Sequence, residues 1–213
     1  MGNPFDPMNI ILLVFAVVAF IRLRSALGKR TGNEDPLNNK SNFKFNNFKK
    51  PKQTKQSDAI SLNTKDEILN YLSVSDKSFT QQSFIEGSKK AYEMIVQNYA
   101  MGNLSSIKDF ISGDVYDGFA EAIELRNKLK QKLFNDVIEF DSVEIKDATL
   151  LKDMVQIQVV FETKMISYGM NSDEELIEGN KDSPQVIKDT WIFQKSIRSK
   201  DPGWELISTN ADD

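Results

Sequence analysis

Apolar and polar positions are grouped in blocks along this chain of 213 residues, and the first block is apolar. Residues 7–21 carry no charged side chain. Four cations follow within nine positions, namely Arg22, Arg24, Lys29 and Arg30. As a helix the segment would be about 22 Å long, shorter than the roughly 30 Å hydrocarbon core of a bilayer. Because the first two arginines can extend their charges to the headgroups, the helix can continue to Leu27. The pattern predicts a transmembrane anchor over residues 1–27.

Two other interpretations of this segment stay open. A secretory signal peptide has its cations before the apolar run and a small-residue cleavage site after it, whereas here only the α-amino group precedes the run. A buried core helix is also typical of a short apolar run, but the polar residues that follow offer it nothing to pack against. Cations on the C-terminal side favour an anchor with its N-terminus outside and the rest of the chain in the cytoplasm.

The second block, residues 28–61, is rich in Asn and Lys and nearly free of aliphatic side chains. It cannot bury enough apolar surface to offset the entropy lost on ordering, which predicts a disordered basic tether. Three phenylalanines, Phe43, Phe45 and Phe48, lie among its lysines. They form either a membrane-interface or partner-binding patch, or part of an inert linker.

Helical periodicity follows the tether. A capping box at Thr64 and Glu67 predicts a short amphipathic helix, followed by a linker, within residues 62–78. Apolar residues at 84–99 then step by three and four, which is the spacing of one helical face. Gly102 is placed to end that helix.

Two further helices are predicted after this glycine. Asn103 can cap a second helix that ends at Gly113, and Asp114 can open a third. Arg126 falls on the apolar side of the third helix. Either its stem packs on the core with the charge paired or in water, or it lines a pocket and meets an acidic ligand.

After residue 132 the pattern changes to alternation, which predicts strands. The expected strands lie at 137–145, 155–161, 186–197 and 204–208. Asp201-Pro-Gly203 is a turn signal, because Pro fixes φ and Gly tolerates positive φ. The acidic segment 171–183 lacks the alternating ligands and central glycine of a calcium loop, which favours a solvated hairpin. Helices followed by an antiparallel sheet predict an α+β domain.

Charge divides the chain into two regions. Residues 22–56 hold ten Lys and Arg against two Asp and Glu, a net charge of +8, whereas residues 57–213 hold 17 against 28, a net charge of −11. We expect the basic region to be attracted to anionic phospholipid and the acidic region to be repelled by it. A domain of this negative charge is a poor partner for nucleic acid.

Cysteine is absent and the sequence contains no histidine. Nucleophile–base pairs built on these residues, Ser–His–Asp relays and thiolate or imidazole zinc sites are therefore excluded. A phosphate-binding glycine loop is also missing. We expect no enzyme, no cofactor and no metal. The remaining enzymatic alternative is a carboxylate–tyrosine pair, which requires an Asp or Glu buried beside Tyr92, Tyr99 or Tyr116.

Several local motifs resemble those of one family. Residues 84–96 read FIEGSKKAYEMIV and residues 99–103 read YAMGN, with Val115, Tyr116, Phe119 and Arg126 following. Near the end, residues 189–195 read DTWIFQK and residues 199–206 read SKDPGWEL. Over residues 80–209 the chain resembles the Tim44-like domain family, with mild departures at Ser88, Asn103 and Lys195.

The resemblance implies a cone-like fold related to nuclear transport factors, in which a curved sheet and helices surround an apolar cavity. It assigns residues 79–213 to this domain. The mitochondrial namesake of the family is a peripheral adaptor that docks on cardiolipin-containing membrane and recruits a chaperone motor. Bacterial members resemble adaptors of the inner membrane, and no enzyme is known in the family. The lipid contact of the family lies near the start of the domain, which corresponds here to the tether and the helix from Thr64.

The sequence therefore favours a membrane-tethered adaptor that binds a protein client at the cytoplasmic face of a bacterial inner membrane. The alternative is a domain that binds lipid or another amphiphile in an apolar cavity against Arg126, and an enzyme is less favoured. The expected membrane contacts are Arg22, Arg24, Lys29, Arg30, Lys49, Lys50, Lys52 and Lys55. The expected cavity or partner-binding residues are Tyr92, Tyr99, Phe119, Arg126, Trp191, Phe193 and Trp204. The oligomeric state stays open.

Overall fold

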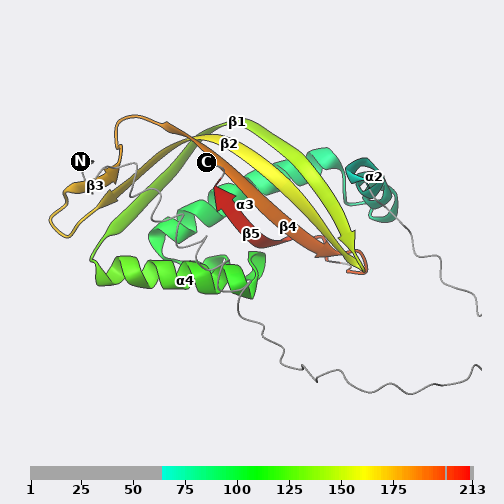
Figure 1. The fold of residues 1–213 in the computed structure, drawn as a ribbon, viewed down its shortest axis with the longest axis horizontal. Helices are drawn as coiled ribbons and strands as arrows, with labels where there is room; N and C mark the ends of the chain where they lie inside the picture. Colours follow the sequence, from blue (N-terminus) through cyan, green and yellow to red (C-terminus); the bar gives the residue numbers. More distant parts are fainter. Residues whose placement is uncertain (1–63, 200, 212–213) are drawn as a thin grey trace, which may run out of the picture.

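The computed structural model describes residues 64–199 and 201–211, and it shows helices packed against one antiparallel sheet (Figure 1). The helical elements are α2 (Lys65–Ser75), α3 (Gln81–Met101), the 3₁₀ turns η1 (Leu104–Ser106) and η2 (Lys108–Phe110), and α4 (Gly113–Lys128). The strands are β1 (Lys132–Leu151), β2 (Met154–Met170), β3 (Leu176–Gly179), β4 (Gln185–Ser196) and β5 (Glu205–Ala211). The predicted α+β class is confirmed for this part of the chain.

The predicted anchor and tether lie outside the described residues, as do all the basic residues expected to contact a membrane. Within the described ranges, no helix combines the length and the apolar character needed to cross a bilayer.

The predicted capping residues begin α2 and end α3. The Thr64 side chain accepts a hydrogen bond from the backbone N–H of Glu67 at 3.3 Å, and the Glu67 carboxylate accepts one from the Thr64 N–H at 3.1 Å. Thr80 forms the same reciprocal pair with Ser83 at the start of α3. Gly102 ends α3 with φ of 74°, a left-handed conformation that favours glycine.

The prediction of a helix from Asn103 to Gly113 is wrong, because this segment forms the separate turns η1 and η2. Asn103 makes no capping hydrogen bond to the backbone, and its side chain bonds instead to the side chains of the next two serines. Leu104 and Ile107 are both buried in the core. Two apolar residues three positions apart therefore face the core from short turns and imitate the spacing of a longer helix.

α4 begins one residue earlier than predicted. Its N-cap is Ser112, whose Oγ accepts a hydrogen bond from the backbone N–H of Val115 at 3.3 Å. Gly113 is thus the first residue of α4 and not a helix stop. The backbone N–H of Ser112 also donates to the Leu206 carbonyl oxygen at 2.9 Å, which joins the start of α4 to β5.

The strands of the sheet follow the order β1-β2-β4-β5, and β3 pairs with β2 beyond the end of β4. The predicted strands are all present, but β1 has 20 residues and is much longer than expected. Its register against β2 shifts at three places. Each β-bulge adds an unpaired residue, interrupts the alternation and bends the strand. The bulges explain why sequence alternation revealed only the middle of β1, and the sheet curves over the helices (Figure 1).

The sequence predicts a hairpin at residues 171–183 and a turn at residues 201–203, and the structure agrees fully only with the first. Residues 171–183 form the β2–β3 hairpin and its return, as predicted. At Asp201-Pro-Gly203, however, Gly203 does not adopt a positive φ. The Asp201 carboxylate instead accepts a hydrogen bond from the Gly203 N–H at 2.8 Å. The side chain of Asp201 therefore supplies the turn contact that a special glycine conformation was expected to provide.

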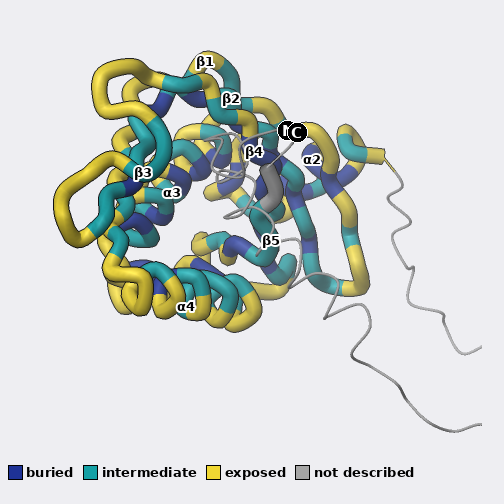
Figure 2. Tube along the Cα trace, turned by 60° about the vertical axis from the view of Figure 1, so that its left-hand side comes forward, coloured by how far each residue is buried: buried dark blue, intermediate teal, exposed yellow. Residues whose placement is uncertain are grey.

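The core lies between the inner face of the sheet and α3, as the buried positions show in Figure 2. Alternate residues of β2 from Val155 to Met165 are buried. They face Tyr92 and Ile95 of α3, which are also buried. α2 adds Ile68, Leu69 and Leu72 to the same core. α2 therefore contributes to the same core as the helices and strands that follow it.

Candidate functional site

A buried polar cluster joins α3 to the sheet. The Tyr92 hydroxyl donates a hydrogen bond to the Asp189 carboxylate of β4 at 2.5 Å, and it lies 3.4 Å from the Thr163 hydroxyl of β2. Tyr92 and Thr163 are 0% exposed, and Asp189 is 9% exposed. Because Asp189 lies opposite Phe161 in the β2–β4 register, its side chain points to the inner face of the sheet.

Burial strongly raises the pKa of the Tyr92 phenol, and the negative charge of Asp189 raises it further. The phenol therefore stays protonated over the physiological range. Its O–H is a constant donor to a carboxylate that the protein interior shields from water.

This pair has the composition that the enzyme alternative requires, an acid beside a tyrosine. Aromatic side chains of the core, however, enclose this pair. The rings of Phe161 and Trp191 lie with centroids 4.7 and 4.6 Å from the Tyr92 ring, and the Phe140 ring lies at 5.7 Å. A substrate can reach the Tyr92 hydroxyl only if the core opens. We interpret the Tyr92–Asp189 pair as a structural link between α3 and β4.

The other expected aromatic residues extend the core. Trp191 and Phe193 are buried on β4. Trp204 is half-buried, and its ring lies 4.8 Å from that of Phe84. These side chains pack against the sheet, as strand aromatics commonly do.

Arg126, near the C-terminal end of α4, lies beside the C-terminus of α3. Its Nη2 donates hydrogen bonds to the carbonyl oxygens of Tyr99 and Ala100, both at 3.0 Å. Its guanidinium carbon lies 5.3 Å from the centroid of the Tyr99 ring, which in turn lies 4.7 Å from the Phe119 ring. Arg126 therefore satisfies carbonyl groups that a helix end leaves unpaired and places a positive charge at the negative end of the α3 dipole.

Glu178 is a site residue that the sequence analysis missed. It lies on β3 directly opposite Gly169 of β2. A Cβ atom added to Gly169 would lie 2.6 Å from both Cγ and Oε1 of Glu178, so the side chain lies flat over the glycine. Burial raises the pKa of Glu178, and the nearby positive charge of Arg126 opposes this effect. The sequence showed several acidic residues in this hairpin, and only the β2–β3 register distinguishes this one.

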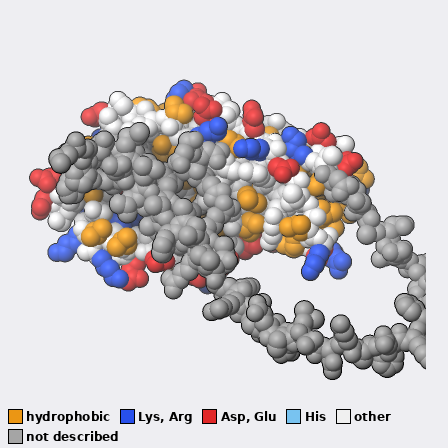
Figure 3. Space-filling model, in the orientation of Figure 1, with side chains coloured by type: hydrophobic (Ala, Val, Ile, Leu, Met, Phe, Trp, Pro, Cys, Tyr) orange, Lys and Arg blue, Asp and Glu red, His pale blue; other side chains and the backbone are white. Residues whose placement is uncertain are grey.

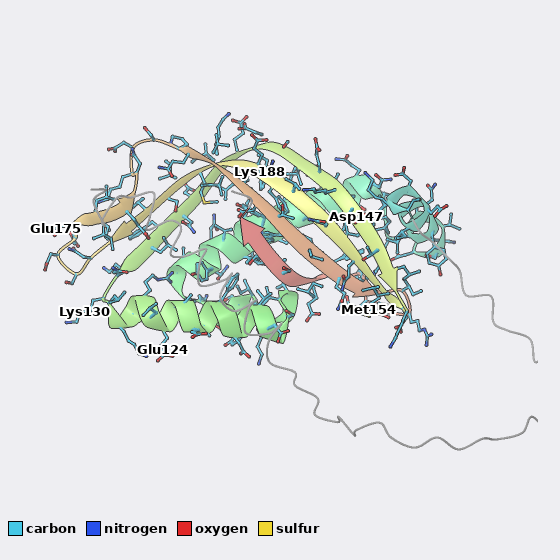
Figure 4. All side chains as sticks on the ribbon, in the orientation of Figure 1. Glu124, Lys130, Asp147, Met154, Glu175 and Lys188 are labelled. Carbon is cyan, nitrogen blue, oxygen red and sulfur yellow. The ribbon has the colours of Figure 1, made fainter. Side chains whose placement is uncertain are left out.

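Tyr99, Arg126 and Glu178 together form what we call the Arg126 cluster. Burial raises the pKa of Tyr99 and lowers that of Arg126, while Glu178 acts electrostatically on both side chains. Lys130, just after α4, and Glu175, in the β2–β3 loop, lie toward the same end of the domain in Figure 4.

Comparison with known proteins identifies the family. Residues 66–211 match the family described as Tim44-like domain. The chain belongs to the Tim44-like domain family. The comparison with curated proteins gives no match. Among solved structures, the chain is similar to the intermembrane space region of chloroplast protein ARC6. The two are 11% identical with a TM-score of 0.42, over 62% of this chain and 97% of that one.

This Tim44-like domain holds its first helix by an ion pair. Lys195 Nζ of β4 lies 2.7 Å from the carboxylate of Asp76, the residue that ends α2. Hydrogen bonds from Lys195 and then from Ser78 lower the pKa of Asp76 to about 2. At the other end of the helix, Lys65 Nζ donates to the Ile145 carbonyl oxygen at 3.4 Å.

The apolar side of α2 faces the core of the Tim44-like domain and is not available to a bilayer. Its outward positions include Asp66 and Glu67, which are exposed and acidic. Such a surface does not attract anionic lipid. The membrane contact expected near the start of the domain therefore depends on the basic tether, and there it stays a prediction.

Proposed function

We propose that this Tim44-like protein is a membrane-tethered adaptor that holds a protein client at the cytoplasmic face of a bacterial inner membrane. The family match over residues 66–211 is the observation that carries the proposal. The resemblance that the sequence motifs indicate is to adaptors and not to enzymes. The buried position of the Tyr92–Asp189 pair agrees with a domain that works through its surface.

The order of charges along the chain supports the tethered arrangement. An uncharged segment at 7–21 precedes a region of net charge +8, and a region of net charge −11 follows. Attraction of the basic region to anionic headgroups and repulsion of the acidic domain would keep the domain away from the lipid surface. In the face shown in Figure 3, acidic and basic side chains are interspersed over the described surface.

The contacts of α2 support a firm attachment of the tether. α2 begins at Lys65, directly after the tether, and its apolar residues belong to the core. If residues 28–61 form the flexible tether that the sequence predicts, its root-mean-square length would be about 30 Å. Confinement to that distance raises the effective concentration of the domain near membrane-bound partners into the millimolar range.

The proposal is tested by crosslinking in living cells. A photoreactive amino acid is placed at Val74, which is 84% exposed on α2, in the full-length chain. The matched control keeps residues 1–63 and replaces the domain with an unrelated soluble domain carrying the same photoreactive group. We expect a defined set of crosslinked proteins that the control lacks, and the same set from both chains would contradict the proposal.

Orientation is tested separately. Protease added to intact spheroplasts should leave the domain uncut, and it should degrade the domain once the membrane is opened. Cleavage of the domain in intact spheroplasts would show that it lies outside the cytoplasm.

A further inference from the structure

The outer face of the sheet, opposite the core, carries large apolar side chains near its edge. β1 pairs with β2 alone among the described strands and so forms one edge of the sheet. Phe134 of β1 is 37% exposed, Ile138 of β1 is 50% exposed, and Val186 of β4 is 59% exposed.

The strand register places Phe134 and Val186 on this outer face. Phe134 lies opposite Tyr168 of β2, and the two rings stack with their centroids 4.7 Å apart. Val186 lies opposite Lys164 of β2. Both of these β2 residues alternate with the buried positions of the strand, so they and their partners face away from the core.

A β-bulge adds Ile138 to the same face. Ile138 is the extra residue where the register shifts between Val137 and Glu139. The side chains of Val137 and Phe140 pack against the core, so the two residues between them, Ile138 and Glu139, face outward. The bulge thus puts an exposed aliphatic side chain directly beside a carboxylate.

Four exposed acidic residues of β1 lie on this face. Lys164 Nζ lies 2.9 Å from the Glu139 carboxylate and 2.8 Å from that of Asp141, so both carboxylates are on one side. Asp136 and Glu144 lie opposite outward residues of β2. These four carboxylates and the three apolar side chains form what we call the outer patch. From Asp136 to Glu144 the face holds five carboxylates and two cations, a net charge of −3, when the adjacent strands are included with Glu162, Lys164 and Lys188.

Protection of a sheet edge explains only part of this pattern. Bulges and charged side chains on an edge strand prevent it from pairing with another chain, and β1 has both. Such protection does not require three large apolar side chains exposed on the adjoining face. Because the bulges interrupt a continuous ladder, an occupant would bind through side chains and not as an added strand. The matching occupant has apolar side chains interspersed with cations.

The chain itself contains a segment of this composition. Residues 42–52 read NFKFNNFKKPK, with three phenylalanines, four lysines and no acidic residue. Its charge of +4 is opposite in sign to that of the outer face. The segment lies outside the described residues.

The point where the tether joins the domain brings this segment within reach of the outer patch. Lys65, the first residue of α2, donates through Nζ to the Ile145 carbonyl oxygen of β1 at 3.4 Å. Ile138 is seven residues from Ile145, roughly 23 Å along the strand. If residues 53–63 are flexible, their root-mean-square span is about 18 Å, and the effective concentration of the segment at β1 is in the millimolar range.

We propose that residues 42–52 dock on the outer patch of their own chain. The lysines pair with the carboxylates of β1, and the phenylalanines cover the exposed side chains of Phe134, Ile138 and Val186. Anionic lipid attracts the same lysines, so the membrane surface and the outer patch compete for one segment. This contact goes beyond the adaptor function and does not depend on it, because no client takes part.

Paired cysteines test the docking in the full-length chain, which has no cysteine of its own. Asn46→Cys is combined either with Ser142→Cys, within the acidic part of β1, or with Thr149→Cys as the control. Both strand positions face outward, three and four residues from Ile145, and Thr149 is the more exposed. In uncharged detergent micelles at low salt, the disulfide to position 142 should form at least about tenfold faster than that to position 149. Mass spectrometry of tryptic peptides measures both rates.

Two sets of variants test the contribution of charge. Asp136→Asn with Glu144→Gln should slow the disulfide to position 142 about fivefold, whereas Asp173→Asn with Glu174→Gln, which removes two charges from the exposed β2–β3 loop, should leave the rate unchanged. In the second set, Lys49, Lys50 and Lys52 are replaced by Gln. This change is outside the described domain and should slow the reaction to a similar extent, so the test remains valid even if the β1 variant is unstable.

Lipid composition tests the competition. The paired-cysteine protein is reconstituted in vesicles of phosphatidylcholine alone or of phosphatidylcholine with phosphatidylglycerol. The preference for position 142 over position 149 should persist in the neutral vesicles and fall to less than about twofold in the anionic ones.

Several outcomes would overturn the inference. Equal rates at positions 142 and 149 in neutral micelles would show that the segment has no preferred place on β1. A rate that neither set of charge variants lowers would show that the carboxylates do not hold the segment. Disulfides that form only between two chains, at a rate that rises with protein concentration, would assign the outer patch to a second copy. A preference that is the same in neutral and anionic vesicles would exclude the competition with lipid.

Discussion

Lys195 Nζ lies 2.7 Å from the Asp76 carboxylate, so an ion pair joins the last part of β4 to the residue that ends α2. Lys195 is 8% exposed and the Asp76 side chain is 29% exposed. The two partners are therefore not equivalent. The loss of Asp76 leaves a buried ammonium group unpaired, whereas the loss of Lys195 leaves a carboxylate that water can reach.

This asymmetry predicts unequal effects of two substitutions on the free energy of unfolding. Asp76→Asn should reduce it by about 1 to 2 kcal/mol, because a buried charge loses its partner. Lys195→Met should reduce it by less than about 1 kcal/mol, because an apolar side chain of similar length replaces the buried ammonium. Urea denaturation measures both values, with Lys188→Met on the exposed face as the control. Equal losses for the two variants would show that the burial of Lys195 does not matter.

The same ion pair predicts a dependence of stability on acid. The pKa of Asp76 is about 2 in the folded domain and 3.8 by the reference value. Because the folded pKa is the lower one, its contribution is present above about pH 4 and is lost as pH falls toward 2. Partial solvent exposure limits it to about 1 kcal/mol.

The measurement compares urea denaturation of wild type and Asp76→Asn between pH 5 and pH 2. The difference in unfolding free energy between the two proteins should shrink as the pH falls. A difference that stays constant over this range would mean that protonation of Asp76 is not the cause.

Tyr92→Phe tests the buried link between α3 and β4. The substitution removes only the hydroxyl that donates to Asp189. A carboxylate with 9% exposure then loses a short hydrogen bond, which should reduce the unfolding free energy by about 2 to 3 kcal/mol. Tyr116→Phe, at a half-buried tyrosine on α4, should change it by less than about 0.5 kcal/mol. Similar values for the two variants would show that the Tyr92–Asp189 bond contributes nothing specific.

The sequence predicts features of this fold that depend on local chemistry. Thr64 with Glu67 and Gly102 mark helix ends through contacts within a few residues, and both predictions are confirmed. The turns near Leu104 were misread because buried residues at a spacing of three do not reveal how far a helix continues. The length of β1 was hidden by bulges, whose positions depend on pairing with β2.

The candidate site shows the same limit. Arg126 was recognisable as a cation on an apolar helix face, but its partners are carbonyl groups about 26 residues earlier in the chain. Glu178 could not be distinguished from its acidic neighbours, because its position depends on its register opposite Gly169. Contacts between elements that are far apart in the sequence decide which residues meet, and they have no signature in a single sequence.

The basic tether yields a prediction about membrane binding. In a chain that lacks residues 1–27, replacement of Lys49, Lys50, Lys52 and Lys55 by Gln should weaken binding to anionic vesicles. Each lysine near the surface contributes up to about 1 kcal/mol at low salt, and the effect should decline as the Debye length falls from about 30 Å at 0.01 M salt to about 10 Å at 0.1 M. Vesicle sedimentation at these two salt concentrations measures it.

A second variant separates charge from apolar contact in the tether. Replacement of Phe43, Phe45 and Phe48 by Ser keeps every charge and should leave the salt dependence of vesicle binding unchanged. If the lysine variant binds as well as the parent chain and salt has no effect, while the phenylalanine variant loses binding, the aromatic side chains make the contact. Electrostatic attraction would then not explain why an acidic domain follows a basic segment, because the domain would be held at the surface by insertion of rings and not by charge.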